Sequence, residues 1–147
     1  MRALVQRVSE ARVDVGARTI GAIDSGLLVL FCAVNGDDVA DAEHLAGKIA
    51  KLRIFEDDAG KMNQSVVDVS GAVLVVSQFT LAANTSKGNR PSFISAARPD
   101  VAVPLMEDFI RALESFTLNV ETGEFGADMS VHLINDGPVT IWIDTQE

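Results

Sequence analysis

The 147-residue sequence contains one cysteine, Cys32, and can therefore form no internal disulfide. Cys32 lies in an apolar run from Leu27 to Val34, where a small buried thiol is the expected role. A single cysteine fits a reducing compartment. No apolar stretch approaches the roughly 20 residues that a membrane helix needs, and Met1–Arg7 lacks the apolar centre of a secretory signal. These absences predict a soluble, cytoplasmic protein that has no membrane partner.

Histidine is also scarce. The two histidines, His44 and His132, are far apart, and there is no cysteine pair, His-Glu-x-x-His, Gly-x-Ser-x-Gly or phosphate loop. The sequence therefore predicts no metal and no cofactor, and it argues against histidine as a general base. A triad of Ser77, His132 and Asp136 can be imagined, but nothing in the spacing supports it.

Positive charge is absent after Arg111, where seven carboxylates follow, and the whole chain carries a net charge of −9. This balance argues against a broad phosphate-binding surface. The segment 84–98 has the opposite charge, because Lys87, Arg90 and Arg98 occur there without an acid. The pattern predicts a small basic lip on an acidic body, which could hold the end of a nucleic acid but not a long duplex.

What is present suits a folded domain, with 48% hydrophobic and 22% charged residues. Alternation and apolar runs predict two helices among seven or more strands, in the order β-β-β-α-β-β-α-β-β. The predicted strands are 3–15, 18–23, 26–34, 52–55, 72–78, 130–134 and 139–143. The first helix follows Asn35-Gly36-Asp37-Asp38, and the second is striped from Leu105 to Phe116, with Pro104 in its first turn or before it.

Most consecutive strands in this order lack a crossover helix. The sequence therefore predicts an α+β fold, as a single compact domain over residues 1–147, with a largely antiparallel, barrel-like sheet.

Two segments are candidates for chemistry. In Ser77-Gln78-Phe79-Thr80-Leu81, polar side chains appear where an apolar strand should leave the core, which is a common place for binding residues. The same hydroxyl groups could simply satisfy the backbone at the strand end. The second segment, Asn135-Asp136-Gly137-Pro138-Val139-Thr140, is typical of a tight turn between strands, and a cis Gly-Pro bond would present its carbonyls in a fixed direction.

Taken together, the segments resemble the D-aminoacyl-tRNA deacylase family over essentially the whole chain. The resemblance is carried, in order, by Val5-Gln6-Arg7-Val8, Gly26-Leu27-Leu28-Val29-Leu30, Lys48–Phe55, Gly60-Lys61-Met62-Asn63, Ser77–Leu81, Arg90-Pro91-Ser92-Phe93, Glu121-Thr122-Gly123, Phe125-Gly126-Ala127 and Asn135–Thr140. The chain departs from the family pattern at Ala82-Ala83-Asn84 and Asn89-Arg90, where many relatives carry an aromatic residue, an acid and a basic pair.

The resemblance implies a homodimer that hydrolyses the ester of D-aminoacyl-tRNA at two interfacial sites. Carried onto this chain, Ser77, Gln78, Phe79 and Thr80 hold the 3′-terminal aminoacyl-adenosine. The remaining residues that it implies are Gly137 and Pro138 from the partner subunit, Arg7 as a brace of the Gly-Pro loop, and Met129 and Phe125 as walls for the adenine.

The expected mechanism uses backbone N–H groups near Phe79 and Thr80 to stabilise the developing oxyanion, while water attacks with help from the substrate's 2′-hydroxyl. A covalent Thr80 nucleophile is the alternative, although no base for it is evident. Two other readings stay open, namely a nucleic-acid-binding module without catalysis and a small-molecule esterase with a Ser or Thr nucleophile. Glycyl-tRNA is expected as a second substrate, because glycine has no side chain to reject.

Overall fold

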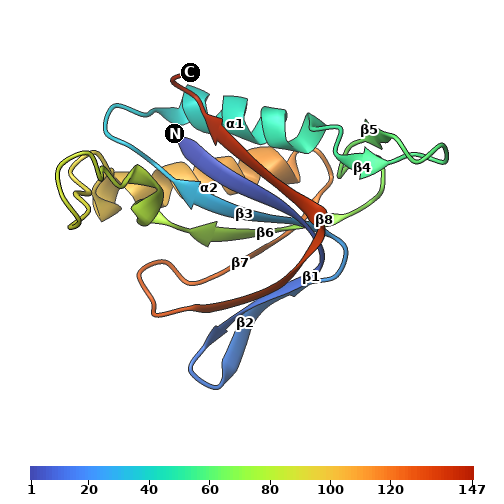
Figure 1. Cartoon of the computed structure of the whole chain (residues 1–147), viewed down its shortest axis with the longest axis horizontal. Coiled ribbons are helices and arrows are strands. Elements are labelled where there is room, and N and C mark those ends of the chain that lie inside the picture. Colours follow the sequence, from blue (N-terminus) through green and yellow to red (C-terminus); the bar gives the residue numbers. More distant parts are fainter.

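The fold is organised around a long, bent first strand (Figure 1). In this computed structural model, which describes residues 1–147, β1 (Arg2–Val15) pairs along its length with β8 (Ser130–Asp144). On its other edge, the first part of β1 pairs with β3 (Gly26–Cys32) and the second part with β2 (Arg18–Ile23). All three pairings are antiparallel, as the sequence predicts.

Two further strands extend the sheet in parallel. β6 (Ala72–Ser77) lies beside β3, and β7 (Asn119–Thr122) lies beside β6. Each parallel pair follows a crossover helix, because a short turn cannot return the chain in the same direction. A small antiparallel sheet of β4 (Phe55–Glu56) and β5 (Met62–Gln64) stands apart. The predicted α+β fold with a largely antiparallel sheet is thus confirmed. The sheet is mixed, because the pairs β3–β6 and β6–β7 are parallel.

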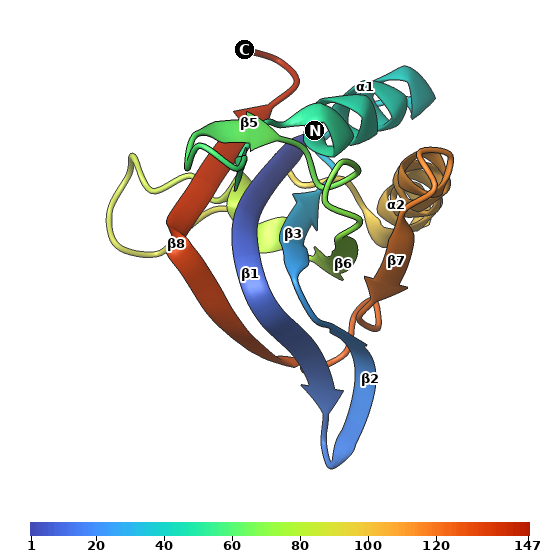
Figure 2. The same ribbon diagram turned by 90° about the vertical axis from the view of Figure 1, so that its right-hand side faces the viewer.

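The sheet curls into a nearly closed barrel (Figure 2). Its order is β2-β1-β3-β6-β7, with β8 on the free edge of β1. β2 approaches β7 so closely that a Cβ atom added at Gly21 would lie 2.5 Å from the carbonyl oxygen of Thr122. The absence of a side chain at Gly21 therefore allows the two backbones to meet.

The first helix, α1 (Val39–Lys51), begins where the sequence predicts. Asp38 accepts a hydrogen bond from the Asp41 N–H, and the Asp41 carboxylate accepts one from the Asp38 N–H, which forms a reciprocal capping box. The helix buries residues at three- and four-residue spacing against the sheet; these are Ala42, Leu45, Ala46, Ile49 and Ala50.

The second helix, α2 (Pro99–Glu114), begins five residues before Pro104, so the prediction of its start was wrong. Pro99 suits the first helical position because it has no N–H to leave unpaired. Pro104 lies inside the helix, and packing of the helix offsets the hydrogen bond that it removes. The packed face consists of Ala102, Leu105, Met106, Phe109 and Leu113.

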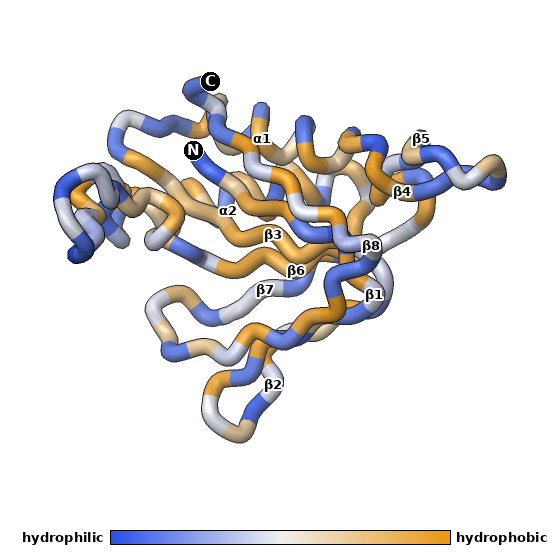
Figure 3. Tube along the Cα trace, viewed as in Figure 1, coloured by the Kyte–Doolittle hydropathy of each residue, from blue (hydrophilic) through white to orange (hydrophobic).

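Two apolar layers fill the fold. A core of 24 buried residues lies between the helix pair and the sheet, and it includes a stacked contact between Phe31 and Phe109 at 4.9 Å between ring centroids. A smaller cluster of 7 residues, including Val13 and Leu74, fills the lower part of the barrel. Figure 3 shows the apolar strands inside and a hydrophilic loop between β6 and α2.

Three strand predictions need correction. Residues 52–54 are not a strand, since the Ile54 carbonyl accepts from the Arg7 side chain instead of a ladder partner. β7 lies in a segment where the sequence analysis predicts no strand. The two predicted strands 130–134 and 139–143 are halves of one strand, β8, because both pair with β1 in the same direction. No helix in the structure has the length and apolar character needed to span a membrane.

A candidate active site at the end of β6

The candidate site begins where β6 ends at Ser77 and the chain enters a short 3-10 helix, η1 (Phe79–Ala82). Gln78 makes this turn with φ −146° and ψ 74°. Ser77 and Gln78 are half-buried, whereas Phe79 is 58% exposed and Thr80 is also exposed. The structure thus places these polar groups at the edge of the core, as the sequence predicts.

The start of η1 presents two backbone donors. The turn is closed by hydrogen bonds from Leu81 N–H to the Gln78 carbonyl and from Ala83 N–H to the Thr80 carbonyl, each at 3.1 Å. The first N–H groups of a helix have no carbonyl in a preceding turn, so those of Phe79 and Thr80 are left for other partners. The Thr80 hydroxyl accepts a hydrogen bond from the Gln78 amide, and neither histidine nor any carboxylate is hydrogen-bonded to it.

Two cavities flank this strand end. They have volumes of about 360 and 300 Å³, and they share Ser77, Gln78, Phe79 and Gly126. The larger cavity is mostly apolar and extends below Phe125 to α2; its other lining residues are Phe31, Cys32, Ala33, Ala96, Ala97, Pro99 and Ala102. The smaller cavity continues along Val76, Ala127, Asp128, Met129 and Val131. The segment 125–129 therefore borders both, which brings Phe125 and Met129 next to the Ser-Gln-Phe segment.

Cys32 lies at the floor of the larger cavity and is 2% exposed. Its Sγ atom is 3.5 Å from the Ala33 carbonyl oxygen and 3.7 Å from the Phe79 carbonyl oxygen, and these two acceptors share its single hydrogen. Burial raises the pKa of the Cys32 thiol, against a smaller opposing effect of the Arg2 charge. The thiol is therefore held neutral beneath η1, as expected of a small buried residue.

The loop after η1 forms the rim of the site. The Phe79 and Phe93 rings meet edge to face with centroids 5.1 Å apart. Lys87 and Arg90 lie on the exposed part of this loop, and exposed Arg98 pairs with Asp100 at 3.4 Å. The loop that carries the basic lip of Lys87, Arg90 and Arg98 thus contacts the candidate site through Phe93.

The second predicted segment forms a bulge in β8 instead of a turn between two strands. Gln6 pairs with Thr140 and Val8 with Asn135, so four residues, 136–139, lie opposite one residue of β1. Gly137 has φ +126°, and the Gly137–Pro138 peptide bond is cis. We call this segment the Gly-Pro bulge.

Arg7, which the resemblance implies as a brace, is hydrogen-bonded to the backbone of the Gly-Pro bulge. It is 6% exposed, its Nε donates to the Asp136 carbonyl at 3.1 Å, and its Nη1 donates to the Ile54 carbonyl at 2.6 Å. The Asn135 amide donates to the carbonyls of Arg7 and Val139, each at 3.0 Å. The start of the bulge is therefore tied to β1, and the Asn135 amide joins the two ends of the bulge to each other.

The Gly-Pro bulge and η1 do not meet within one chain. Across the sheet, Ser77 of β6 pairs with Phe31 of β3, and Phe31 pairs with Ala3 of β1. The Gly-Pro bulge instead lies opposite Arg7 of β1. Four residues of β1 separate these levels, roughly 13 Å at about 3.3 Å per residue. Neither Gly137 nor Pro138 lines either cavity beside η1.

The imagined Ser77, His132 and Asp136 triad does not form. His132 Nε2 lies 3.3 Å from Asp14, and Asp136 lies beside Arg7 at 3.6 Å. No group of three or more His, Cys, Asp or Glu residues comes together in a way that could hold a metal ion.

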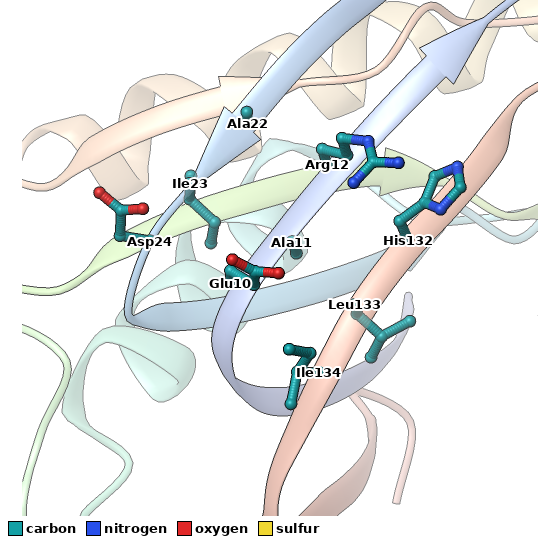
Figure 4. Close-up of a pocket in the computed structure, with 9 residues that line it drawn as sticks. All are labelled: Glu10, Ala11, Arg12, Ala22, Ile23, Asp24, His132, Leu133 and Ile134. Carbon is teal, nitrogen blue, oxygen red and sulfur yellow. The ribbon is translucent and has the colours of Figure 1, made fainter.

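A third cavity, of about 370 Å³, lies over β1, β2 and β8 and contains none of the predicted site residues (Figure 4). Figure 4 shows Glu10, Arg12 and His132 around it. Asp14 lies beside His132. A hydrogen bond from the Thr19 hydroxyl lowers the pKa of Asp14, and its interactions with Arg12 and His132 lower it further. This cluster explains the position of His132, which serves as a partner of Asp14.

Comparison with known proteins assigns the class. Residues 4–144 match the sequence model of the family described as D-Tyr-tRNA(Tyr) deacylase. The chain is 60% identical over 147 residues to the D-aminoacyl-tRNA deacylase of Paracoccus denitrificans (strain Pd 1222), covering 100% of this chain and 99% of that protein. It is 59% identical to that of Ruegeria sp. (strain TM1040), covering 100% and 94%. The chain is thus a deacylase, a class of hydrolase, and it belongs to the D-Tyr-tRNA(Tyr) deacylase family.

Solved structures share the fold. The structure named c-Myc DNA Unwinding Element Binding Protein has a TM-score of 0.93 and 42% identity, with 99% of both chains covered. A probable eukaryotic D-amino acid tRNA deacylase has a TM-score of 0.80, with 97% of both chains covered, and at 17% identity it supports the fold alone.

Sequence reasoning missed several residues around the site. Phe31 and Ala33 reach the larger cavity because β3 runs parallel to β6, and Ala96 and Ala97 reach it from the loop before α2. Asn135 was noted only as a turn residue, although its amide ties the Gly-Pro bulge to β1. Only the strand pairing, and no local pattern, identifies these contacts.

Proposed function

We propose that the chain hydrolyses the ester bond of D-aminoacyl-tRNA and releases a free D-amino acid and tRNA. The observation that carries this proposal is the start of η1, where Phe79 borders both cavities and Thr80 is the next residue of the 3-10 turn. This geometry occurs in a family whose members catalyse deacylation. The proposal includes a cytoplasmic location, where tRNA is charged and used.

The substrate's 3′-terminal aminoacyl-adenosine occupies the strand end. Its adenine lies against Met129 and Phe125, which border the two cavities, and its ester carbonyl faces the start of η1. The basic lip contacts phosphates of the acceptor end. The net charge of −9 limits such contacts to this small region, so the protein binds an end and not a long duplex.

Catalysis needs no cofactor in this proposal. An aminoacyl ester is already activated, so positioning and charge stabilisation supply most of the acceleration. Water attacks the ester carbonyl carbon, assisted by the substrate's 2′-hydroxyl, and the N–H groups of Phe79 and Thr80 donate to the developing oxyanion. The bond from the carbonyl carbon to the ribose 3′ oxygen then breaks, and that oxygen takes a proton.

A covalent Thr80 nucleophile is the less favoured mechanism. A threonine hydroxyl needs a base, and the partner of Thr80 Oγ is the amide of Gln78, which is not basic. The test is Thr80→Ala, which retains appreciable hydrolysis if the backbone N–H is the stabilising group. An acyl-enzyme trapped on Thr80, together with complete loss of activity in the variant, would establish the covalent route instead.

The active form in this proposal is a homodimer. The Gly-Pro bulge lies too far from η1 to act in its own chain, so it enters the site of the partner subunit. Arg7 and Asn135 fix the bulge, so its carbonyls have a set direction in which to bind the amino group of a D-residue. The same rigid backbone blocks the side chain of an L-residue. Glycyl-tRNA is accepted because glycine has no side chain at this position.

The direct test compares release of amino acid from D-tyrosyl-, L-tyrosyl- and glycyl-tRNA, with the same tRNA preparation for the two tyrosyl substrates. We expect fast release of D-tyrosine and glycine and slow release of L-tyrosine, unaffected by chelators. Equal rates for the D- and L-substrates would contradict the proposal, as would activity that chelation removes and zinc restores.

Two other functions predict different results. A nucleic-acid-binding module without catalysis would bind duplex DNA with strong salt dependence and would leave charged tRNA intact. The similar structure named for DNA binding motivates this alternative, and the net charge of −9 argues against it. A small-molecule esterase would be labelled covalently by an acyl probe.

A further inference from the structure

Arg2 connects three elements around the candidate site. Its Nε donates to Asp144 of β8 at 3.0 Å, and its Nη1 donates to the Leu81 carbonyl of η1 at 3.0 Å. Its guanidinium carbon lies 5.8 Å from the centroid of the Trp142 ring. The Arg2 side chain is 29% exposed and that of Asp144 only 8%. One cation thus ties β1 and the end of β8 to the segment that follows the candidate donors.

The carbonyls of η1 are held from several directions. The Phe79 carbonyl accepts from the Cys32 thiol at 3.7 Å, and the Ala82 carbonyl accepts from the Ser95 hydroxyl at 3.1 Å. Among the donors to the Phe79, Leu81 and Ala82 carbonyls, only the Arg2 guanidinium, which binds Leu81, is charged. Charge-assisted hydrogen bonds are roughly twice as strong as neutral ones. Because a single 3-10 turn has few bonds of its own, outside contacts must set its orientation.

We propose that Arg2 is a positioning residue of the deacylase. By fixing the Leu81 carbonyl against Asp144, it holds η1 so that the N–H groups of Phe79 and Thr80 face the ester oxygen. This inference rests on the proposed function. The Arg2 charge also acts at the floor of the larger cavity, where it opposes the effect of burial on the pKa of Cys32.

The test removes the clamp while keeping the fold. Arg2→Met keeps much of the side-chain volume but loses both hydrogen bonds. We expect kcat for D-tyrosyl-tRNA to fall about tenfold with KM little changed, since a hydrogen bond to a charged group contributes about this much. Arg2→Lys should recover only part of the rate, because one ammonium cannot reproduce the fixed fork of a guanidinium.

A double-mutant cycle tests whether Asp144 acts through Arg2. Asp144→Asn should lower kcat less than Arg2→Met does, and the double variant should match Arg2→Met, because both changes break the same clamp. Arg12→Met is the matched control, since Arg12 is also on β1 and pairs with Asp14 at 3.2 Å, without contact to η1. Its kcat should equal that of the wild type.

A measurement of η1 itself separates this inference from the proposed function. Amide hydrogen exchange at Leu81 and Ala83, the N–H groups that close η1, should be faster in Arg2→Met, while the β1 and β8 amides stay protected. A folded Arg2→Met protein with wild-type kcat and unchanged exchange at these amides would overturn the inference. If the wild type fails to hydrolyse D-tyrosyl-tRNA, the proposed function fails, and the exchange result alone decides whether Arg2 holds η1.

Discussion

Arg7 and Gly137 show how single residues shape the Gly-Pro bulge. Arg7 is buried inside the sheet, yet its hydrogen bonds go to the backbone of the bulge and of Ile54. A buried guanidinium is tolerated because carbonyl oxygens accept from it. Gly137 leaves room for this side chain, and a larger residue would displace it.

Gly137→Ala should therefore damage the site. The added Cβ atom would lie 2.8 Å from Arg7 Nη2 and 3.0 Å from Val139 Cγ2, at a φ of +126° that alanine rarely adopts. We expect D-tyrosyl-tRNA hydrolysis to fall about 10²-fold, as for a displacement of about 1 Å in an active site. Single-turnover rates of both tyrosyl-tRNAs would measure the change.

Gly16→Ala is the control for Gly137→Ala. Gly16 also has a positive φ, +58°, but an added Cβ atom would meet nothing within 4 Å. This variant should keep its rate and its preference for the D-substrate. A Gly137→Ala protein with wild-type rate and selectivity would reduce the bulge to an ordinary backbone irregularity.

Phe79→Pro offers a way to delete a backbone donor. Proline suits the first position of a helix, and Gln78, with φ −146° and ψ 74°, lies outside the α region that a following proline disfavours. Phe79→Ala removes the ring but keeps the N–H, so the difference between the two variants isolates the donor. We expect Phe79→Pro to be slower than Phe79→Ala by about 10²-fold in kcat, the usual cost of one oxyanion donor. Equal rates in the two folded variants would exclude the Phe79 N–H from catalysis.

At the scale of elements, one buried ion pair joins the start of β1 to the loop before α1. The Met1 ammonium lies 2.7 Å from Asp37 Oδ1 and donates to the Thr145 hydroxyl at 2.8 Å. The other Asp37 oxygen accepts from the Val34 N–H at 2.7 Å, and neither side chain of the pair is exposed. The pair thus orients β1, β3 and α1 relative to one another.

Asp37→Asn should destabilise the whole fold. It leaves the ammonium buried without a countercharge, which costs about 3 kcal/mol or more. Urea unfolding measures the loss. The neighbouring Asp38→Asn is the matched control, because Asn caps a helix about as well as Asp and position 38 is exposed. If both variants lost the same small amount, the buried pair would contribute little to stability.

At the scale of the whole molecule, the proposed site needs two parts that lie apart in one chain, η1 after the end of β6 and the Gly-Pro bulge within β8. A twofold dimer would bring the Gly-Pro bulge of each chain to η1 of the other and create two equivalent sites. Subunit complementation tests this directly. Phe79→Pro disables the η1 half of a site, and Gly137→Ala disables the bulge half, so each pure variant should be nearly inactive.

Mixing and reassociating these two variants should restore activity. Half of the randomly formed dimers are mixed, and each mixed dimer has one site built from two wild-type halves, so we expect about a quarter of the wild-type rate. Light scattering tests whether the protein is a dimer. A mixture no more active than its components, or a fully active monomer, would place the Gly-Pro bulge outside the site.

The distribution of charge makes a prediction about tRNA binding. Lys87→Glu and Arg90→Glu should raise KM for D-tyrosyl-tRNA and weaken its salt dependence, because each lost phosphate contact lowers the slope by roughly 0.7 to 0.9. Arg18→Glu makes the same charge change at an exposed residue of β2, outside the cavities beside η1, and should have little effect. Equal effects at all three positions would mean that only the net charge matters.

Local patterns in the sequence determined several elements of this protein. Helix α1 follows from its capping box and its apolar spacing, both of which act within four residues. Alternation predicted β1 and β2, and the polar residues after β6 indicated a site at the strand end. The basic lip also followed from sequence, since three cations lie within a 15-residue stretch without an acid.

Only the tertiary structure decided how these parts meet. β7 and the parallel pairing of β6 depend on residues far apart in the chain, and the start of α2 before Pro104 depends on packing of the helix face. The Gly-Pro segment reads as a turn because its residues favour one locally. It is a bulge because β1 pairs on both sides of it and Arg7 binds its backbone, and these long-range hydrogen bonds outweigh the local preference.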